Sequence, residues 1–367
     1  MQHATDILQS VWDDASAACA LYHLPGSEEV VAISGTAAES NGFPTDAMRT
    51  RGFLIAPFFS DTSTPTVLIP PQSIVSVRME ELPAGHELAV PYTTDETEQR
   101  TAYDSAFQKI SDALRKGEVR KVVLSRRLCL KFPEGTCVNP LEIFYKACHI
   151  YPRAFVALWH TPSSGMWLVC TPECLLEHRP PGLWHTMALA GTMTWEAGAP
   201  AGRRAYWSHK DQQEQKYVAD YIRQRLAPFA LQLEVSPTYP IRAGALAHLR
   251  TDFTFTMQCE QDLSALVDAL HPTPAVCGIP TDKATQLIRQ AEATPRRYYA
   301  GYSGPLNMDG RSHLYVTLRC AHFEPDGKTA TLFAGGGILR ESTCGTEWME
   351  TSRKMETILS LLRPTNT

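Results

Sequence analysis

The chain has 367 residues, of which 44% are hydrophobic and 20% are charged, and its formal net charge is −5 at pH 7. This composition is typical of a folded globular protein with a substantial core, and the length allows either two average domains or one large domain. The negative net charge, without a clustered basic segment, argues against nucleic acid as a partner.

The N-terminal sequence MQHATDILQSVWDD has no basic region followed by an apolar core, so it does not indicate a signal peptide. No stretch approaches the roughly 20 apolar residues that cross a bilayer. The ten cysteines are scattered and form no C-x-x-C pair, which favours buried reduced thiols over disulfides. We therefore expect a cytoplasmic protein that does not insert into membranes.

The first hundred residues give the weaker structural signals. An amphipathic helix is expected over residues 6–22, with short strands around residues 30–33 and 52–58. Proline and threonine recur over residues 61–96 and predict surface loops there.

Beyond residue 100 the hydrophobic periodicity is clearer. Tyr103, Phe107, Ile110 and Leu114 are spaced by four, three and four residues, which predicts a helix that Gly117 ends. Further helices are predicted over 211–226 and 347–362, and strands over 121–132, 154–160, 166–178, 312–324 and 330–338. Because strand–turn–strand pairs are frequent, the pattern favours a large α+β protein over a parallel β-α-β series.

The last predicted helix carries three charged residues on one face. Glu347, Glu350 and Lys354 are spaced by three and four residues. Such a face is usually solvated, but this helix follows the glycine run AGGGI, which lets backbone approach a ligand. Carboxylates are also the hard oxygen ligands that Mg²⁺ takes.

Four other residues are candidates, each with a structural alternative. Glu214 points toward the packed face of its helix, where a glutamate is either hydrogen-bonded structure or a ligand. Lys121 begins a buried strand and either extends to solvent or acts as a base in a cleft. Glu173, buried after Pro172, could keep its proton and act as a general acid. Arg319, inside the predicted strand LYVTLRC, requires a bound carboxylate or an internal salt bridge.

Eight stretches, taken in this order, resemble the chorismate-utilising enzymes, which are the isochorismate, salicylate, anthranilate and aminodeoxychorismate synthases. They are KVVLSR, TPECLL, LAGT, EQKYV, LHPTPAVCGIP, RRYYAGYSG, TLRCA, and AGGGI followed by EWMETSRK. The resemblance implies one α+β domain with two large packed antiparallel sheets, outer helices and a cleft between the sheets. Residues 101–367 would form the chorismate-binding core and residues 1–100 a variable N-terminal part of the same domain. A monomer is expected.

The resemblance also implies a role for each site residue. Glu214, Glu347 and Glu350 would hold Mg²⁺, which would grip the ring carboxylate of chorismate. Lys121 would be the general base and Glu173 the general acid. The substrate-binding residues would be Tyr299, Arg319, Gly335, Lys354, Gly191, Thr192 and His271, although a lone histidine such as His271 is structural by default.

Within this family the residues favour the isochorismate synthases. Branches that use ammonia carry a glutamine where this chain has Lys121, so water is the expected nucleophile, and we expect no amidotransferase subunit. The aminodeoxychorismate branch places a lysine where this chain has Ala190. A salicylate synthase, which goes on to eliminate pyruvate, shares the site residues and is the alternative. Whether the product serves menaquinone or siderophore synthesis is left open.

The chain departs from the family pattern at four places. They are Val169, Gln215, MTWEAG at 193–198 and Cys344, where the family has a glycine, a histidine, an arginine-rich tail and a proline. None of these removes a proposed catalytic group. An inactive binding protein with the same fold is therefore disfavoured, because Lys121, Glu173 and the metal-binding glutamates are all present.

Overall fold

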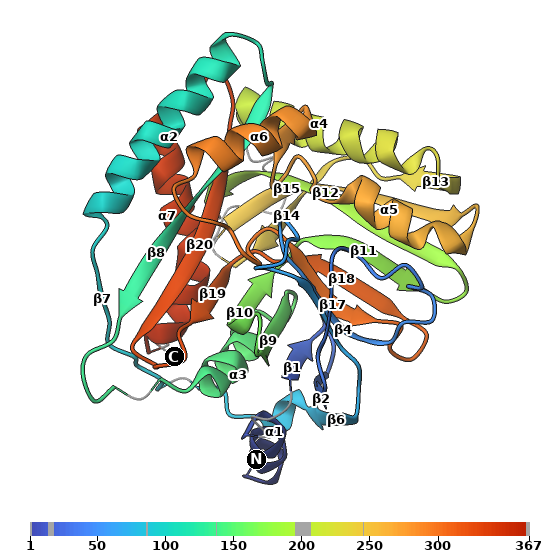
Figure 1. Ribbon diagram of the computed structural model, residues 1–367, viewed down its shortest axis with the longest axis vertical. Helices are drawn as coiled ribbons and strands as arrows, with labels where there is room; N and C mark the ends of the chain where they lie inside the picture. Colours follow the sequence, from blue (N-terminus) through green and yellow to red (C-terminus); the bar gives the residue numbers. More distant parts are fainter. Residues whose placement is uncertain are drawn as a thin grey trace, which may run out of the picture.

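The computed structural model describes residues 2–13, 18–85, 87–136, 138–194, 207–244 and 246–364. Two ten-stranded sheets, in which every recorded strand pair is antiparallel, form the framework of this part of the chain (Figure 1). The predicted α+β architecture with two large antiparallel sheets is confirmed.

The first sheet has the strand order β16-β8-β20-β19-β10-β9-β1-β2-β6, and β7 pairs with β8. Its strands are β16 (Gly278–Ile279), β8 (Lys121–Lys131), β20 (Thr329–Ile338), β19 (Cys320–Phe323), β10 (Gly165–Thr171), β9 (Phe155–Thr161), β1 (Ala18–His23), β2 (Glu29–Gly35), β6 (Ser73–Arg78) and β7 (Thr93–Thr94).

The second sheet has the order β13-β15-β12-β11-β18-β17-β4-β5-β3, and β14 pairs with β15. Its strands are β13 (Ala230–Val235), β15 (Leu246–Met257), β12 (Leu183–Thr194), β11 (Cys174–Arg179), β18 (Ser312–Val316), β17 (Tyr302–Leu306), β4 (Gly52–Ala56), β5 (Thr66–Ile69), β3 (Ala38–Ser40) and β14 (Tyr239–Ala243).

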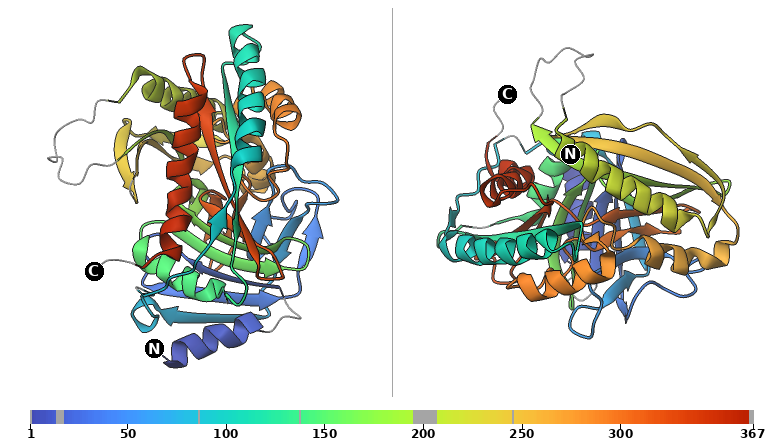
Figure 2. Two further views of the ribbon diagram at one scale, coloured as in Figure 1. Left: turned by 90° about the vertical axis from the view of Figure 1, so that its left-hand side faces the viewer. Right: turned by 90° about the horizontal axis from the view of Figure 1, so that it is seen from above.

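Helices pack around both sheets. They are α1 (Gln2–Asp13), α2 (Thr97–Arg115), α3 (Pro140–Ile150), α4 (His209–Leu226), α5 (Leu263–Leu270), α6 (Thr281–Ala291) and α7 (Cys344–Leu359). The larger core joins the two sheets with the apolar faces of α2, α4, α5 and α6. A second core lies on the other face of the first sheet, under α1, α3 and α7 (Figure 2). Within the described ranges, no helix is long and apolar enough to span a bilayer.

Several sequence-based predictions need correction, among them the strand predicted over 312–324, which is two strands, β18 in the second sheet and β19 in the first. The helix predicted over residues 6–22 ends at Asp13, and the fully buried run Ala18–His23 is the strand β1. The predicted loops over residues 61–96 contain β5 and β6, which pair with β4 and β2. Residues 166–178 form two strands rather than one, because β10 belongs to the first sheet and β11 to the second.

Two of the places where the chain crosses between the sheets are neighbours. Pro172 and Glu173 connect β10 to β11, and residues 317–319 connect β18 back to β19. The crossings are bonded together, since Val316 N–H donates to the Glu173 carbonyl (2.9 Å) and Cys170 N–H donates to the Arg319 carbonyl (3.0 Å). Two predicted site residues therefore meet at the seam between the sheets.

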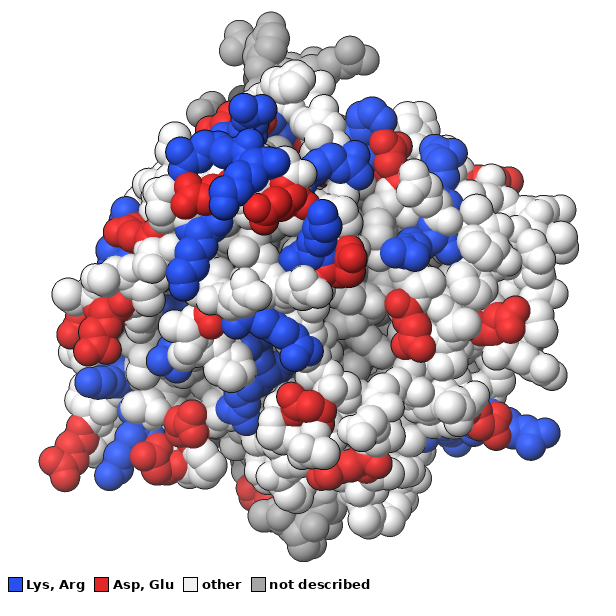
Figure 3. Space-filling model, turned by 45° about the horizontal axis from the view of Figure 1, so that its top comes forward, with Lys and Arg blue, Asp and Glu red and all other residues white. Residues whose placement is uncertain are grey.

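The surface and the cysteines add little that is specialised. Basic and acidic side chains are interspersed on the face seen in Figure 3, mainly over its left half. The nine described cysteines are free thiols, as expected. The tenth, Cys137, and residues 195–198 of the MTWEAG segment lie outside the described residues.

Candidate active site

A narrow cleft of about 50 Å³ lies at the seam between the sheets. Eight of the predicted site residues line it, namely Glu173, Gly191, Thr192, Glu214, Tyr299, Arg319, Gly335 and Lys354. Small-molecule pockets measure about 300–1,000 Å³, so the lining side chains would have to move apart to admit a ring-sized ligand. The residues predicted from scattered sequence stretches are thus brought together around one space.

Lys121 is the most deeply buried charged group of this site. It begins β8, its side chain is 0% exposed, and its Nζ lies 2.9 Å from Oε1 of Glu214 on α4. The ammonium has no directional hydrogen-bond partner among the described residues. Lys121 is therefore held in place by charge, while its N–H groups remain available to another acceptor.

Glu173 is a buried carboxyl group at the first crossing. Only 4% of the residue is exposed. Burial raises the pKa of Glu173 from 4.5 to about 7, although the positive charges of Lys121, Arg319 and Lys354 oppose the shift. Because the pKa lies near neutrality, Glu173 can hold a proton at physiological pH and donate it.

Arg319 lies at the second crossing and not inside a strand, which corrects the prediction. Its φ of 48° is left-handed, and the salt bridge weighed as its alternative role is not found among the described residues. Instead its Nη2 lies 3.2 Å from Nε2 of His248, and His248 Nδ1 lies 2.9 Å from the Gly191 carbonyl. The geometry assigns the proton to Nδ1, which donates to the carbonyl, and leaves Nε2 to accept from the guanidinium.

His248 is neutral in this arrangement. Burial and the charge of Arg319 lower the pKa of His248 to about 3. The ring thus orients the guanidinium without adding positive charge. Arg319 keeps its other donors for a ligand carboxylate, which its planar fork is suited to bind.

The glycine run at the end of β20 provides space for neighbouring side chains. A Cβ at Gly335 would lie 2.7 Å from the Tyr299 hydroxyl, and one at Gly337 would lie 2.2 Å from Glu214 Oε1. On the other side of the strand, a Cβ at Gly336 would lie 3.1 Å from Glu347 Oε2. Successive strand residues face opposite sides, so three glycines in a row open both faces of β20.

Glu347 and Glu350, in the first turns of α7, complete a cluster of charged groups with Glu214. Lys210 Nζ lies 2.6 Å from Glu347 Oε1 and 3.9 Å from Glu350 Oε2. Lys354 Nζ lies 2.7 Å from Glu350 Oε1 and donates to the Gly335 carbonyl (2.9 Å). Burial opposes the charge on Lys210, but Glu347, Glu350 and Glu214 outweigh it and raise the pKa of Lys210.

The cluster has the donor chemistry of a Mg²⁺ site. Glu214, Glu347 and Glu350 all act on the ammonium of Lys210, while Glu214 also pairs with Lys121 and Glu350 with Lys354. The buried Oε2 of Glu347 has no hydrogen-bond partner among the described residues. Carboxylate oxygens are the hard donors that Mg²⁺ takes, and here each of the three carboxylates contacts a lysine ammonium at a position that a cation can occupy. The chemistry of these donors therefore fits the metal that the sequence resemblance implies. Among the described residues, however, the group of three ligand atoms within 4.8 Å of one another is Cys174, Glu177 and His185, so Glu214, Glu347 and Glu350 would have to draw together around the ion.

Lys121, Glu347 and Glu350 do not line the cleft themselves but pair with residues of the site, whereas His271 lies apart from it. His271 packs its ring edge-on against Phe58 and Tyr302, and its Nε2 lies 3.1 Å from the Ala300 carbonyl. Burial lowers the pKa of His271 to about 4, so the ring is neutral. His271 therefore supports the core, and the prediction that it binds substrate is not met by the geometry.

Lys210 and His248 are site residues that the sequence analysis missed. Lys210 lies four residues before Glu214, so both project from the same face of α4, and this spacing was a usable signal. His248 is a lone histidine in an apolar strand, and nothing local distinguishes it. Gln215, where the family pattern has a histidine, donates to the Ala188 carbonyl (3.1 Å) and to Thr251 Oγ1 (3.2 Å) and is structural.

Comparison with known proteins agrees with this site. The family model described as "Chorismate binding enzyme" matches residues 72–363. Isochorismate synthase EntC of Escherichia coli strain K12 is 32% identical over 72% of this chain and 67% of its own length. Isochorismate synthase DhbC of Bacillus subtilis is 27% identical over 91% of this chain and 86% of its own.

A solved structure shares the fold. The structure of MenF, the menaquinone-specific isochorismate synthase of E. coli, superposes with a TM-score of 0.75 at 23% identity, covering 94% of this chain and 88% of that one. At this identity the similarity bears on the fold alone. Together with the family match over residues 72–363, it leads to one conclusion: the chain belongs to the chorismate-binding enzymes.

Proposed function

We propose that the protein is an isochorismate synthase, which converts chorismate to isochorismate with Mg²⁺. The observation that carries this proposal is the buried Glu173, which lines the cleft with a pKa near 7, together with Lys121, whose charge acts on Glu173 and whose ammonium pairs with the cleft residue Glu214. Related isochorismate synthases, named above, support the same activity.

The reaction needs one proton removed and one supplied. Lys121 would act as the neutral amine, not as the ammonium that pairs with Glu214 in this structure, and take a proton from the water that attacks C2 of the ring. Glu173 donates its proton to the C4 hydroxyl, which leaves as water while the double bonds shift between the two carbons. General acid and base catalysis each contribute about 10²–10⁴-fold.

The remaining residues position the substrate. Arg319, the Tyr299 hydroxyl and the Gly335 N–H would bind the carboxylate of the enolpyruvyl side chain, with His248 orienting Arg319. Glu214, Glu347 and Glu350 would hold Mg²⁺, which when bound offsets the charge of the ring carboxylate and fixes the ring in place. Lys354, bonded to both Glu350 and Gly335, would connect the metal ligands to the substrate cleft.

The direct test is to incubate the purified full-length protein with chorismate and MgCl₂ and to follow the products by proton NMR. A mixture of chorismate and isochorismate that does not form in the presence of EDTA is expected. Salicylate and pyruvate as main products would instead identify a salicylate synthase. Unchanged chorismate would contradict the proposal and indicate a binding protein with the same fold.

Removing a proposed metal ligand should weaken Mg²⁺ binding. Glu347→Gln and Glu350→Gln are each expected to weaken Mg²⁺ binding, measured by calorimetry with chorismate present, by more than about tenfold, because loss of outer-shell partners alone costs that much. Glu356→Gln is the matched control on the same helix, since Glu356 pairs with Arg363 at the surface. Equal affinity in all three variants would exclude these glutamates as ligands.

Removing the Lys210 ammonium should have the opposite effect and raise the affinity for Mg²⁺. Its ammonium contacts Glu347 and Glu350 and competes with a cation for the same oxygens. Lys210→Met is therefore expected to tighten Mg²⁺ binding by about tenfold, the value of one charge-assisted hydrogen bond. The control is Lys216→Met, which removes an exposed lysine from the same helix. Unchanged or weaker Mg²⁺ affinity in Lys210→Met would show that Lys210 does not occupy the cation position.

A further inference from the structure

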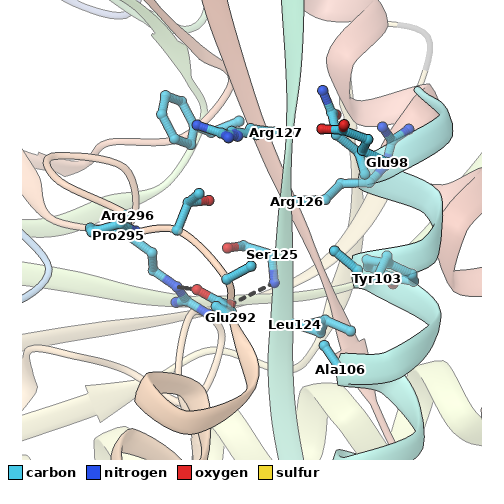
Figure 4. Close-up of a pocket in the computed structure, with 15 residues that line it drawn as sticks. Glu98, Tyr103, Ala106, Leu124, Ser125, Arg126, Arg127, Glu292, Pro295 and Arg296 are labelled. Atoms are coloured by element: carbon cyan, nitrogen blue, oxygen red, sulfur yellow. Dashed lines mark hydrogen bonds and ion pairs between the residues drawn. The ribbon is translucent and has the colours of Figure 1, made fainter. Parts of the chain in front are cut away.

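A second and larger cavity, of about 320 Å³, opens along the edge of β8. One wall is α2, the opposite wall is residues 292–296 after α6, and β8 forms the floor between them (Figure 4). This cavity shares no lining residue with the proposed active site. Phe333 lines it and stacks on Tyr299 of the cleft, with ring centroids 5.6 Å apart, so the two spaces are neighbours.

A carboxylate of the protein already binds the edge of β8 beside this cavity. Glu292 Oε1 accepts from the Ser125 N–H (2.8 Å), and Glu292 Oε2 accepts from Arg296 Nε (2.8 Å). Arg296 Nη1 and Nη2 also donate to the carbonyls of Val276 and Val123. At this point, a strand-edge N–H and a guanidinium together form a carboxylate site.

The same two kinds of donor recur two residues further along β8. Alternate residues of a strand present their backbone groups to the same edge, so the Arg127 N–H faces the same edge as the Ser125 N–H. The Arg127 side chain is exposed, lines the cavity, and extends from β8 toward the 292–296 wall in Figure 4. Among the residues that the structure describes, no hydrogen bond or ion pair is recorded for the Arg127 guanidinium, and none is recorded from the Arg127 N–H to a residue outside the sheet.

The other groups around the cavity restrict the ligand. Leu124, Ala106 and Phe333 supply apolar surface on the floor and walls, which suits a flat apolar body. Arg126 is not available, since it donates to Glu96, Thr351 and Ser352. Glu98, exposed on the α2 wall, adds a negative charge that disfavours ligands carrying more than one.

We propose that this cavity is a binding site for a small monocarboxylate with a flat apolar body, held by the N–H and guanidinium of Arg127. The ligand carboxylate would bind at Arg127 of β8, two residues after Ser125, where the Glu292 carboxylate binds. The volume of about 320 Å³ is that of a small-molecule site.

The test uses 4-fluorobenzoate as a probe, with 4-fluorobenzamide as its neutral counterpart, and follows binding to the full-length protein by ¹⁹F NMR. Saturable binding of the carboxylate, and much weaker binding of the amide, is expected. Arg127→Gln should weaken binding at least about tenfold, as loss of a charge-assisted hydrogen bond does. Arg115→Gln, which removes an exposed arginine of α2, is the matched control and should bind like the parent.

A further variant separates this site from the cleft. Arg319→Gln should leave probe binding unchanged, and thermal melting checks that each variant is folded. The proposal is overturned if the parent protein shows no saturable binding, if Arg127→Gln binds like the parent, or if Arg319→Gln loses the probe, since the probe would then occupy the cleft. Because the readout is binding and not turnover, the result does not depend on the proposed reaction.

Discussion

Replacing Lys121 with methionine is expected to lower kcat for chorismate conversion by about 10²–10⁴-fold, the usual contribution of a general base. Methionine fills a similar volume but cannot accept a proton from water. Chorismate should still bind, because Arg319 and Tyr299, which would hold its side-chain carboxylate, are unchanged. Single-turnover kinetics with saturating chorismate and Mg²⁺, followed by chromatography, measures the effect on the chemical step.

The substitution also leaves Glu214 without its 2.9 Å partner, so a loss of stability has to be separated from a loss of chemistry. Lys146→Met is a matched control. Among the described residues Lys146, on α3, is also a lysine with 0% exposure, and it donates to the carbonyls of Leu88 and Arg363. The Lys146→Met variant should have a lower melting temperature, while kcat of the folded enzyme stays near that of the parent. If Lys121→Met kept kcat within about threefold of the parent, far less than the loss of about 10²–10⁴-fold expected for a missing base, Lys121 would not be the base.

The second large effect concerns Glu173 and the pH dependence of the reaction. Burial raises the pKa of Glu173 to about 7, and a general acid acts only while protonated. The rate supported by Glu173 should therefore be full well below pH 7 and fall as pH rises through about 7. Glu173→Gln should lower kcat by about 10²–10⁴-fold and remove this high-pH decline from the residual activity.

Glu177→Gln is the control for the pH profile. Glu177 is four residues further along, and His185, His313 and Arg179 hold its pKa far below the ordinary value, despite its burial. The control should alter stability and leave the high-pH decline in place. A parent profile that stays flat from pH 6 to 9, or a decline that survives in Glu173→Gln, would remove Glu173 from the proposed role of acid.

Much of the fold followed from local patterns in the sequence. The four-three-four spacing from Tyr103 to Leu114 gave α2, and the β-branched run from Lys121 gave β8. The strand β1 was mistaken for helix because all six of its residues are buried. A continuous apolar run lacks the alternation that distinguishes strand from helix.

The site was less predictable than the elements that carry it. Glu173 and Arg319 interrupt stretches that read as continuous strands, because no local pattern shows that the chain passes from one sheet to the other. The contact of Lys210 with Glu347 joins α4 to α7 across 137 residues, and the hydrogen bond from Arg319 to His248 spans 71. Pairings over such separations are set by the packing of whole elements, which spacing along the chain does not report.

The two crossings couple the packing between the sheets to the positions of two proposed site residues. Each crossing joins a strand of the first sheet to a strand of the second. A small sliding or rotation of one sheet over the other would therefore shift the Glu173 carboxyl group and the Arg319 guanidinium, while the hydrogen bonds within both sheets stayed intact. The layer between the sheets therefore acts as a spacer for the reacting groups. Phe155 of β9 and Tyr315 of β18 stack across that layer with centroids 4.4 Å apart. Substitutions in this layer would change kcat although the substituted residues contact no ligand. Evolution could therefore change the rate through residues of the core.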